Sequence, residues 1–493
     1  MNRSGYEIVT DLPEARLPWR DRPTAWANVS PSTGAYRLNS AGEYLYYPDG
    51  GSVGYDHPVG QIQFGLGCIA SYRTETNPAR RDLFLTRARA QAERLIAQHT
   101  EARGAWWFPY AFPFTHAVHS GVDYQAPWYS GMAQGEAISL FVQLAELEAV
   151  SAEDRARYMA AAAGALASLQ VADDGYPWVV NVNSTGYLWI QEYPGAQPGA
   201  GDYTYNGMIF AAFGVFDYVR ATGDQAAADL YDACATTIAR YFPLLRNQRW
   251  HSFYCQTHRI PAPTYHQHHI NLLAQLHWQT GSPDFAEDVD RLVDDFPAPG
   301  VSGTIRFEAG SHVLCRFDTA ASGAWSSAQE DALLEQRTVT FTRSTSAPAS
   351  MRRRIQGRGI YYLISAGAYA GWWVGENWAT AYLRGIHLAT LYRPDRTVTF
   401  PGESVAVEAY QIAMDGTVIS ARTVAYATPT PALADRRAIV NGRPCFQIVE
   451  GELAGYWVPA SSVTADTEPA LGEPLPLNFP APSRSGAPSL QER

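Results

Sequence analysis

The hydrophobic period of this chain changes from helical to alternating at Pro297, and that change limits the fold more than any other feature. From about residue 58 to 295, apolar residues recur with the spacing of amphipathic helices. After Pro297, apolar and polar residues alternate, as they do in half-buried strands. The predicted helices span residues 61–73, 79–99, 131–148, 153–170, 206–221, 224–242, 264–280 and 283–295. The sequence therefore predicts an α + β multidomain protein whose helical part precedes its β part.

The helical part reads as pairs of helices joined by long connections rich in Gly, Pro and aromatic residues. Such pairs, with their long loops gathered at one end, indicate an incomplete (α/α) toroid or barrel. A helical solenoid would give the same pattern, so both arrangements stay open.

The β part contains an internal repeat. Arg337-Thr338-Val339 recurs as Arg422-Thr423-Val424, and Ala370-Gly371-Trp372-Trp373-Val374 recurs as Ala454-Gly455-Tyr456-Trp457-Val458. Two small all-β repeat modules are therefore expected. The aromatic pairs could form a sugar-binding platform, but a module core is favoured.

The arginines of the first module allow two interpretations. Arg352-Arg353-Arg354 and Arg358 could hold an anionic glycan, but a solvated edge is the default interpretation.

Six segments follow from these patterns. They are an irregular N-terminal segment at 1–55, the toroid at 56–297, the first β module at 300–375, a helical linker at 376–393, the second β module at 394–460, and a Pro-, Ser-, Ala- and Glu-rich tail at 461–493 that is expected to be disordered.

Composition excludes several functions. A net charge of −11 disfavours general binding to nucleic acid or to an anionic membrane. All 37 basic residues are arginine, which rules out Schiff-base catalysis and a Walker A loop. No apolar run is long enough for membrane insertion, and the N-terminus does not resemble a secretion signal. The five cysteines are far apart, so neither a disulfide scaffold nor a zinc site is expected.

The segment Glu192-Tyr193-Pro194 places a carboxylate next to a phenol. Such a pair can move a carbon-bound proton when a sugar is held against it. Pro194 favours an extended backbone at Tyr193, which would point Glu192 and Tyr193 to opposite faces unless a turn intervenes. The competing interpretation is a loop glutamate in a salt bridge beside a packed tyrosine.

A second polar and aromatic segment carries Tyr254, His258 and Arg259, and a helix then begins near Tyr265. On that helix Tyr265 shares a face with His269, and His266 is also a neighbour of His269. A His-x-x-His helix can bind a metal, but no third ligand is evident, so no metal is expected.

Two further segments are Trp128-Tyr129-Ser130-Gly131-Met132-Ala133-Gln134-Gly135 and Tyr55-Asp56-His57-Pro58. Ser130 is positioned to cap the helix that follows it. Within the segment 128–135, we expect Gln134 to be the residue that contacts a sugar. Tyr55 and His57 either line a cleft or pack where the first helix begins.

Together these motifs, over about residues 50–295, resemble the C-terminal domain of the D-glucuronyl C5-epimerases. The resemblance implies inversion of C5 of D-glucuronic acid to L-iduronic acid within a polysaccharide, by proton abstraction and reprotonation without a cofactor. It implies that Glu192, Tyr193, Tyr254 and Tyr265 form the acid/base set and that His258 and Arg259 hold the substrate carboxylate. The other expected substrate contacts are His266, His269, Gln134, Tyr129, Asn206, Tyr55 and His57.

Two departures from that family leave other functions open. Thr257 stands where the family commonly has an arginine, and almost none of the β-domain that precedes the toroid in the animal enzymes is present. A uronic-acid polysaccharide lyase or a glycoside hydrolase remains an alternative. So does a non-catalytic glycan-binding protein, because the β repeats are similar to modules of bacterial surface proteins. The expected partner is a uronic-acid-containing polysaccharide at the cell surface or outside the cell, and a homodimer is left open.

Overall fold

The structure, a computed structural model, describes residues 1–9, 12, 38–116, 123–197, 199–319 and 331–467. This part of the chain divides into two compact units. Among the described residues, the first unit is Met1–Leu245 together with Tyr254–Ile260, and the second is Arg246–Phe253 together with the described part of Pro261–Pro469.

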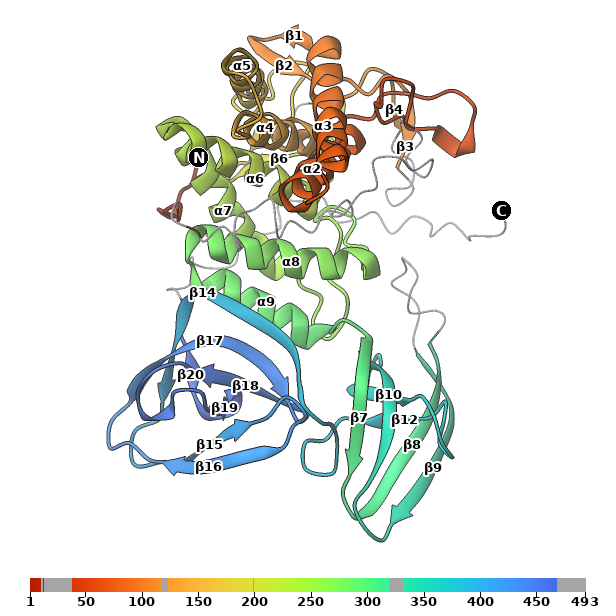
Figure 1. Ribbon diagram of the computed structural model, residues 1–493, viewed down its shortest axis with the longest axis vertical. Coiled ribbons are helices and arrows are strands. Elements are labelled where there is room, and N and C mark those ends of the chain that lie inside the picture. The colour runs from red at the N-terminus through yellow and green to blue at the C-terminus, as the bar shows by residue number, and fades with distance from the viewer. Residues whose placement is uncertain (10–11, 13–37, 117–122, 198, 320–330, 468–493) are drawn as a thin grey trace. The chain divides into compact units, whose positions relative to one another are not determined.

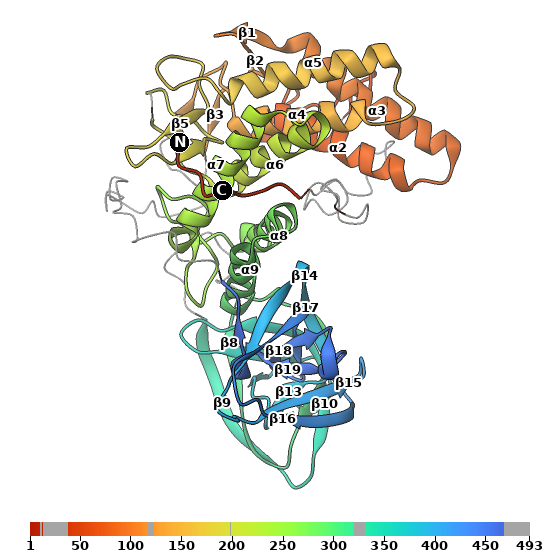
Figure 2. The ribbon, with the colours of Figure 1, turned by 90° about the vertical axis from the view of Figure 1, so that its left-hand side faces the viewer.

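The first unit is built from three helical hairpins (Figure 2). They are α2 (Pro58–Thr74) with α3 (Pro78–Gln98), α4 (Gly131–Ala145) with α5 (Ala152–Ser168), and α6 (Tyr205–Thr222) with α7 (Gln225–Leu245). Helices α2, α4 and α6 also pack against one another, α4 in the middle. Because α4 is apolar on nearly every side, all of its residues are buried.

Glycines let the two central helices approach backbone to backbone. A Cβ atom on Gly135 of α4 would lie 2.2 Å from the Cα of Ala211 on α6. A Cβ atom on Gly214 would lie 1.8 Å from the carbonyl oxygen of Gly135. Neither position has room for a side chain, so these glycines fix the spacing of α4 and α6.

Short antiparallel strands form the connections of this unit. They are β1 (Thr100–Ala102) with β2 (Ala105–Trp107), β3 (Phe114–Thr115) with β4 (Asp123–Tyr124), and β5 (Val180–Val182) with β6 (Leu188–Ile190), and a short 3-10 helix η3 (Pro48–Gly50) precedes α2. Strand β6 of the β5–β6 hairpin is buried, and Glu192 follows its last residue, Ile190, by two positions.

The second unit holds one helical hairpin and two antiparallel sheets (Figure 1). The hairpin is α8 (Pro263–Thr280) with α9 (Pro283–Asp295). The first sheet contains β7 (Gly300–Phe307), β8 (Gly310–Asp318), β9 (Ala332–Phe341), β10 (Thr345–Arg354), β11 (Ile360–Ile364), β12 (Trp373–Gly375) and β13 (Ala381–Leu383). The second contains β14 (Ile386–Phe400), β15 (Val407–Ile412), β16 (Val418–Val424), β17 (Thr430–Val440), β18 (Arg443–Ile448), β19 (Trp457–Pro459) and β20 (Thr464–Ala465), with two short 3-10 helices, η5 (Gly451–Leu453) and η6 (Ala460–Ser462).

The two sheets have the same topology. The strand order of the first is β13-β7-β10-β11-β12-β8-β9, and the second, taken from its β20 edge, runs β20-β14-β17-β18-β19-β15-β16. Each strand of the second sheet thus occupies the place of the strand seven positions earlier in the chain. The sequence repeat therefore corresponds to two copies of one β module.

The repeated aromatic residues pack in the cores of these modules. The guanidinium of Arg337 lies 4.0 Å from the ring centroid of Trp372, and that of Arg422 lies 5.3 Å from the ring centroid of Tyr456. The next residues, Trp373 and Trp457, are buried as well. The favoured interpretation of a module core is thus confirmed, and the sugar-platform interpretation is wrong because these rings are covered by protein.

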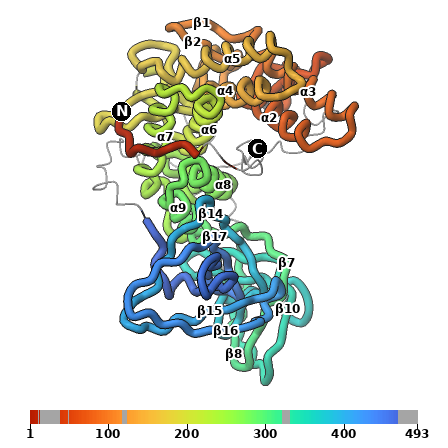
Figure 3. Tube along the Cα trace, turned by 60° about the vertical axis from the view of Figure 1, so that its left-hand side comes forward, coloured from red at the N-terminus to blue at the C-terminus, as the bar shows by residue number. Residues whose placement is uncertain are grey.

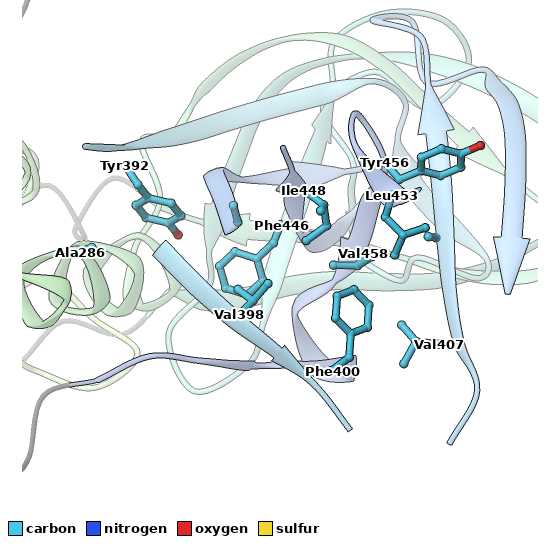
Figure 4. Packing of buried hydrophobic residues seen from close by; sticks show 12 residues of the cluster. Ala286, Tyr392, Val398, Phe400, Val407, Phe446, Ile448, Leu453, Tyr456 and Val458 are labelled. Atoms are coloured by element: carbon cyan, nitrogen blue, oxygen red, sulfur yellow. The ribbon is translucent and has the colours of Figure 1, made fainter. Parts of the chain in front are cut away.

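The second module shares its core with the helical hairpin. Tyr392, Val398, Phe400 and Phe446 pack in one cluster that also includes Ala286 of α9 (Figure 4). Strand β14 contacts both α8 and α9, and β17 pairs with β14 along most of its length (Figure 3). The hairpin therefore packs as a cover on the β14 side of this module.

A buried ionic network reinforces this packing. Arg396 of β14 is 1% exposed and lies 3.2 Å from Asp290 Oδ2 and 3.4 Å from Glu287 Oε2, both on α9. It also lies 3.1 Å from Asp466 Oδ1. Three carboxylates thus surround one guanidinium that has almost no access to water.

The structure corrects several predicted boundaries. The helical linker at 376–393 is wrong, because this stretch holds β13 and the start of β14, separated by a turn in which Gly385 has a φ of 104°. The second module continues past residue 460, since β20 pairs with β14. The remaining predictions for the N-terminal segment and the C-terminal tail fall largely on residues 10–11, 13–37 and 468–493. These residues lie outside the part of the chain that the structure describes.

The predicted toroid at 56–297 is not confirmed as one body. Its last two helices, α8 and α9, belong to the second unit, and the first unit has three hairpins among its described residues. No helix in the described ranges is long and apolar enough to cross a membrane.

The arginine run at 352–354 is not a solvated edge. Arg352 pairs with both carboxylate oxygens of Glu376 at 2.7 and 2.8 Å, and Arg353 contacts both oxygens of Asp331 at 2.9 Å. Arg354 donates to backbone carbonyl groups at the end of α9. These side chains therefore hold the first module together and to the helical hairpin.

Candidate active site

The carboxyl group of Glu192 is buried at the end of the β5–β6 hairpin. Glu192 is 7% exposed. The backbone bends at Glu192 and Tyr193 rather than continuing as a strand. Because of this bend the two side chains meet, and the Tyr193 hydroxyl hydrogen-bonds to the Glu192 carboxylate. The opposite-faces arrangement that an extended backbone would give is therefore not what forms.

Helix α6 begins against this carboxylate. Asn206 Nδ2 donates a hydrogen bond of 3.4 Å to Glu192 Oε2. A Cβ atom on Gly207 would lie 2.3 Å from the same oxygen. Gly207 thus leaves the space that the carboxylate fills in the first turn of α6, where the helix dipole favours negative charge.

Burial, with a smaller contribution from the negative charge of Asp202, raises the pKa of Glu192 to about 8. The hydrogen bonds from Tyr193 and Asn206 act in the opposite direction. A carboxyl group with this pKa exchanges its proton near neutral pH, which is the property required of a general acid or base. An ordinary loop glutamate in a salt bridge would have a lowered pKa instead.

Aromatic rings enclose Tyr193. The ring of His116 meets it edge-on with centroids 4.4 Å apart, and Phe114 stacks on it at 6.0 Å. Tyr124 and Trp128 lie at 5.9 and 6.3 Å. His116 and Tyr124 were not predicted from the sequence, because a single histidine or tyrosine in an irregular loop has no spacing that distinguishes it.

Tyr254 belongs to the same cluster. Its side chain is buried, and its ring lies 5.9 Å from that of His116. Its backbone carbonyl accepts a hydrogen bond from Tyr205, the first residue of α6, and its backbone N–H donates to Ile260. His116 is therefore in ring contact with both predicted catalytic tyrosines of the first unit.

The predicted carboxylate-binding residues lie on the loop after Tyr254. His258 Nδ1 is 3.7 Å from Asp202 Oδ1, and the His258 side chain is 29% exposed. Arg259 is partly exposed and has a φ of 52°, in the left-handed region. The loop thus places two polar side chains at partly open positions next to the buried Asp202.

A second buried carboxylate approaches the cluster from α4. The pKa of Tyr110 is raised by burial, with smaller contributions from the charges of Glu192 and Glu136. Gln63 Nε2 donates to Glu136 at 3.2 Å. Tyr110 stacks on Trp128 with ring centroids 3.8 Å apart. The charges of two acidic groups therefore both raise the pKa of the Tyr110 phenol. The sequence did not reveal this feature.

Ser130, the predicted cap of α4, occupies the N-cap position but makes no capping hydrogen bond with its side chain. Its hydroxyl instead hydrogen-bonds to Tyr110. The Ser130 side chain therefore interacts with the aromatic cluster and does not cap the helix.

Several predicted substrate contacts have structural roles. Gln134 is 0% exposed, accepts from Phe108 N–H and donates to Trp106 O and Ser168 Oγ, so its amide is hydrogen-bonded within the protein. Tyr129 is buried with its hydroxyl 3.2 Å from Thr100 Oγ1.

Tyr55 and His57 pack where α2 begins. His57 caps the helix by accepting from the Gly60 N–H, and its ring stacks on Phe112 at 6.0 Å. Tyr55 forms a bridge with Tyr46 and is partly exposed. The packed interpretation is the one that these contacts favour.

Tyr265, His266 and His269 lie on α8, in the second unit. His266 Nδ1 accepts from the Ser252 N–H at 2.9 Å, and its Nε2 is 3.0 Å from the carbonyl oxygen of Leu292. His269 Nδ1 is 2.8 Å from Ser252 Oγ and the residue is 0% exposed. Tyr265 is partly exposed and its ring meets that of His268 at 5.6 Å. The two buried histidines thus anchor the loop containing Ser252.

Burial favours the neutral form of these rings: it lowers the pKa of His266 to about 4 and that of His269 well below its usual value. Across the described ranges, no three His, Cys, Asp or Glu side chains gather in a way that would hold a metal ion. The five cysteines are buried and free.

Residues 102–293 match the family model described as D-glucuronyl C5-epimerase C-terminus. The resemblance inferred from the motifs is confirmed over that segment, which includes Glu192, Tyr193, Tyr254 and Tyr265. The match supports a carbohydrate-modifying function. Among curated proteins, none has a sequence that matches this chain.

Two solved structures have a distant likeness to the chain. A family 76 glycoside hydrolase (mannosidase) from Bacteroides thetaiotaomicron has 12% identity and a TM-score of 0.35, with 50% of this chain and 60% of that chain covered. A protein described as an autolysin, from Listeria monocytogenes, has 13% identity and a TM-score of 0.15, with 34% of this chain and 63% of that chain covered. The chain thus spans less than two thirds of either protein, and similarity this low supports no argument about fold or activity.

Proposed function

We propose that this protein inverts C5 of a uronic acid within a polysaccharide, the D-glucuronic to L-iduronic conversion. The observation that carries the proposal is the buried Glu192 carboxyl, whose pKa of about 8 suits proton transfer at neutral pH. It lies among tyrosines in the segment that matches the epimerase family.

The proposed reaction removes the C5 proton from one face of the sugar and returns a proton to the other face. Ionised Glu192 takes the proton, and Asn206 and Tyr193 hold its carboxylate in place. Tyr254 donates from the opposite face. Two contacts support this part of the proposal: Tyr193 is hydrogen-bonded to Glu192, and the ring of His116 contacts both Tyr193 and Tyr254.

The substrate carboxylate must be neutralised while charge develops on its oxygens. His258 and Arg259 are the candidates, since both are partly exposed on the loop that carries Tyr254. The guanidinium of an arginine such as Arg259 can bind a carboxylate with two parallel hydrogen bonds.

The test is incubation with heparosan-type and other uronic-acid polysaccharides in deuterated water, followed by NMR. Deuterium at C5 with new iduronate signals and an intact chain is the expected result. Unsaturated product would instead identify a lyase, which begins with the same proton abstraction, and new reducing ends without unsaturation would identify a hydrolase. Binding without any turnover would favour a glycan-binding protein.

Matched variants connect the activity to the site. Glu192→Gln and Tyr254→Phe should each lower the exchange rate by about 100-fold or more, the range typical of a lost acid/base group. Glu101→Gln is the control, because Glu101 is an exposed glutamate of the same unit with 75% side-chain exposure. Equal rates in Glu192→Gln and the parent would remove Glu192 from the mechanism.

A further inference from the structure

A cavity of about 480 Å³ lies in the second unit, and none of its lining residues takes part in the proposed reaction. One wall is the loop at 247–253, which includes Arg249, Trp250 and Phe253. The other wall is the end of β10 and the turn that follows it, with Arg354, Gln356 and Arg358. The volume is that of a small-molecule site.

Three guanidinium groups line this cavity. Arg354 donates to the carbonyl oxygens of Asp294 and Asp295, so it is fixed in place. Arg249 and Arg358 are exposed, and among the described residues neither has an ion pair. Arg358 lies 5.5 Å from the ring centroid of Phe317.

The arginines influence one another electrostatically. Burial lowers the pKa of Arg354, and the charge of Arg249 lowers it further, against the opposing effect of Asp295 and Asp294. An anion that binds between these guanidinium groups reduces the electrostatic repulsion among them.

The remaining lining suits a sugar ring. Trp250 packs edge-on against Phe296 with centroids 5.3 Å apart, and Trp250 and Phe253 give the cavity an apolar wall. The buried oxygen Oε1 of Gln356 has no hydrogen-bond partner among the described residues. A hydrogen bond from a sugar hydroxyl would satisfy such an acceptor.

We propose that this cavity binds an acidic sugar unit, with the carboxylate at Arg249 and Arg358, the ring against Phe253 and a hydroxyl on Gln356. Arginine pairs recognise carboxylates through parallel hydrogen bonds, and aromatic faces pack against sugar rings. The site is a binding site and takes no part in the proton transfer. It does not depend on the proposed function, because binding here requires no reaction at Glu192.

The test is arginine-specific modification of the intact chain by phenylglyoxal, read by peptide mass spectrometry. A glucuronic-acid tetrasaccharide should slow the modification of Arg249 and Arg358 at least about fivefold, whereas its carboxyl-reduced form should not. Arg343 is the internal control, because it is an exposed arginine in the turn between β9 and β10. Its modification should be the same with and without sugar.

A pair of variants measures each arginine separately. In Arg249→Gln, the tetrasaccharide concentration that half-protects Arg358 should rise about tenfold, as expected for one lost charge-assisted hydrogen bond, and Arg358→Gln should do the same for Arg249. Arg343→Gln should leave both values unchanged. Thermal unfolding of each variant controls for a change in fold.

Several outcomes would overturn the proposal. Equal protection by the acidic and the reduced sugar, or no protection by either, excludes recognition of a carboxylate. Protection by inorganic sulfate but not by the tetrasaccharide would indicate an anion site that does not take sugar acids. Deuterium exchange at C5 without protection would refute this site alone, and protection without exchange would refute the epimerase proposal alone.

Discussion

Replacing Glu192 with glutamine should make the stability of α6 depend less on pH. Burial raises the pKa of Glu192 from 4.5 to about 8, so the folded protein favours the neutral carboxyl. Its contribution to stability is complete below about pH 4.5 and is lost as pH rises through the folded pKa near 8. Glutamine has nearly the same shape, stays neutral and has no such loss.

The size of the effect follows from the shift. At about pH 7, some 2.5 units above the unfolded pKa, ionisation on unfolding destabilises the parent by about 3 kcal/mol, and above the folded pKa the penalty approaches about 5 kcal/mol. Glu192→Gln should therefore become more stable relative to the parent by about 3 kcal/mol between pH 4.5 and pH 7.

Native-state hydrogen exchange of α6 peptides measures this difference, because parent and variant compared at one pH share the same intrinsic exchange rate. Glu101→Gln, at an exposed site, should show no pH-dependent difference from the parent. A difference between Glu192→Gln and the parent that is constant from pH 5 to pH 8 would refute the conclusion that Glu192 is buried in its neutral form.

Three further substitutions test the packing around the site and in the second unit. Gly207→Ala should slow C5 exchange at least about tenfold, because its Cβ would lie 2.3 Å from Glu192 Oε2, although alanine favours the helix; parental exchange kinetics would contradict this. Gly135→Ala should lower the free energy of unfolding by about 1–3 kcal/mol in urea denaturation, since its Cβ would lie 2.2 Å from the backbone of α6; an unchanged midpoint would show that the central helices can separate. Arg396→Met should cost about 3–5 kcal/mol because it leaves Asp290 buried without its closest guanidinium. That loss should appear as a lower melting temperature of the second unit, and a higher one would mean that the ionic network opposes folding.

Much of the secondary structure was predictable, because regular periodicity survives in the sequence. Each helix predicted before Pro297 lies within a few residues of a helix in the structure, for example 131–148 against α4. The repeat was also visible, since Arg337 and Trp372 recur as Arg422 and Tyr456 and make the same cation–π contact in both modules. The same contact in both modules requires the same types of residue at equivalent positions, which makes the repeat visible in the sequence.

The sequence was least informative where contacts are long-range. Residues 376–393 have helical spacing, yet β13 pairs with β7 and β14 with β17, so pairing with distant strands overrides the local pattern. Gln134 was chosen for sugar contact because it is polar, but its partners Trp106 and Ser168 are known only once α5 and β2 are placed. Polarity alone does not distinguish a buried, satisfied amide from one that faces a ligand.

The site was predicted in part for the same reason. Glu192 and Tyr193 are adjacent in sequence and therefore visible as a pair, and Asn206 was among the expected substrate contacts. His116 meets Tyr193 from 77 residues earlier in the chain, which no local pattern encodes. The raised pKa of Glu192 also depends on burial by several elements.

The packing of α8 and α9 on the second β module decides where this protein can be cut. A fragment ending at residue 297, where the hydrophobic period changes, would keep both helices but remove Tyr392 and Arg396, which cover Ala286 and Asp290. In such a fragment the apolar surface around Ala286 would be exposed to solvent and Asp290 would lose its arginine partner. The fragment should therefore aggregate on expression. Dissection of the enzyme is therefore better done by point substitution in the full chain than by truncation at the apparent domain boundary.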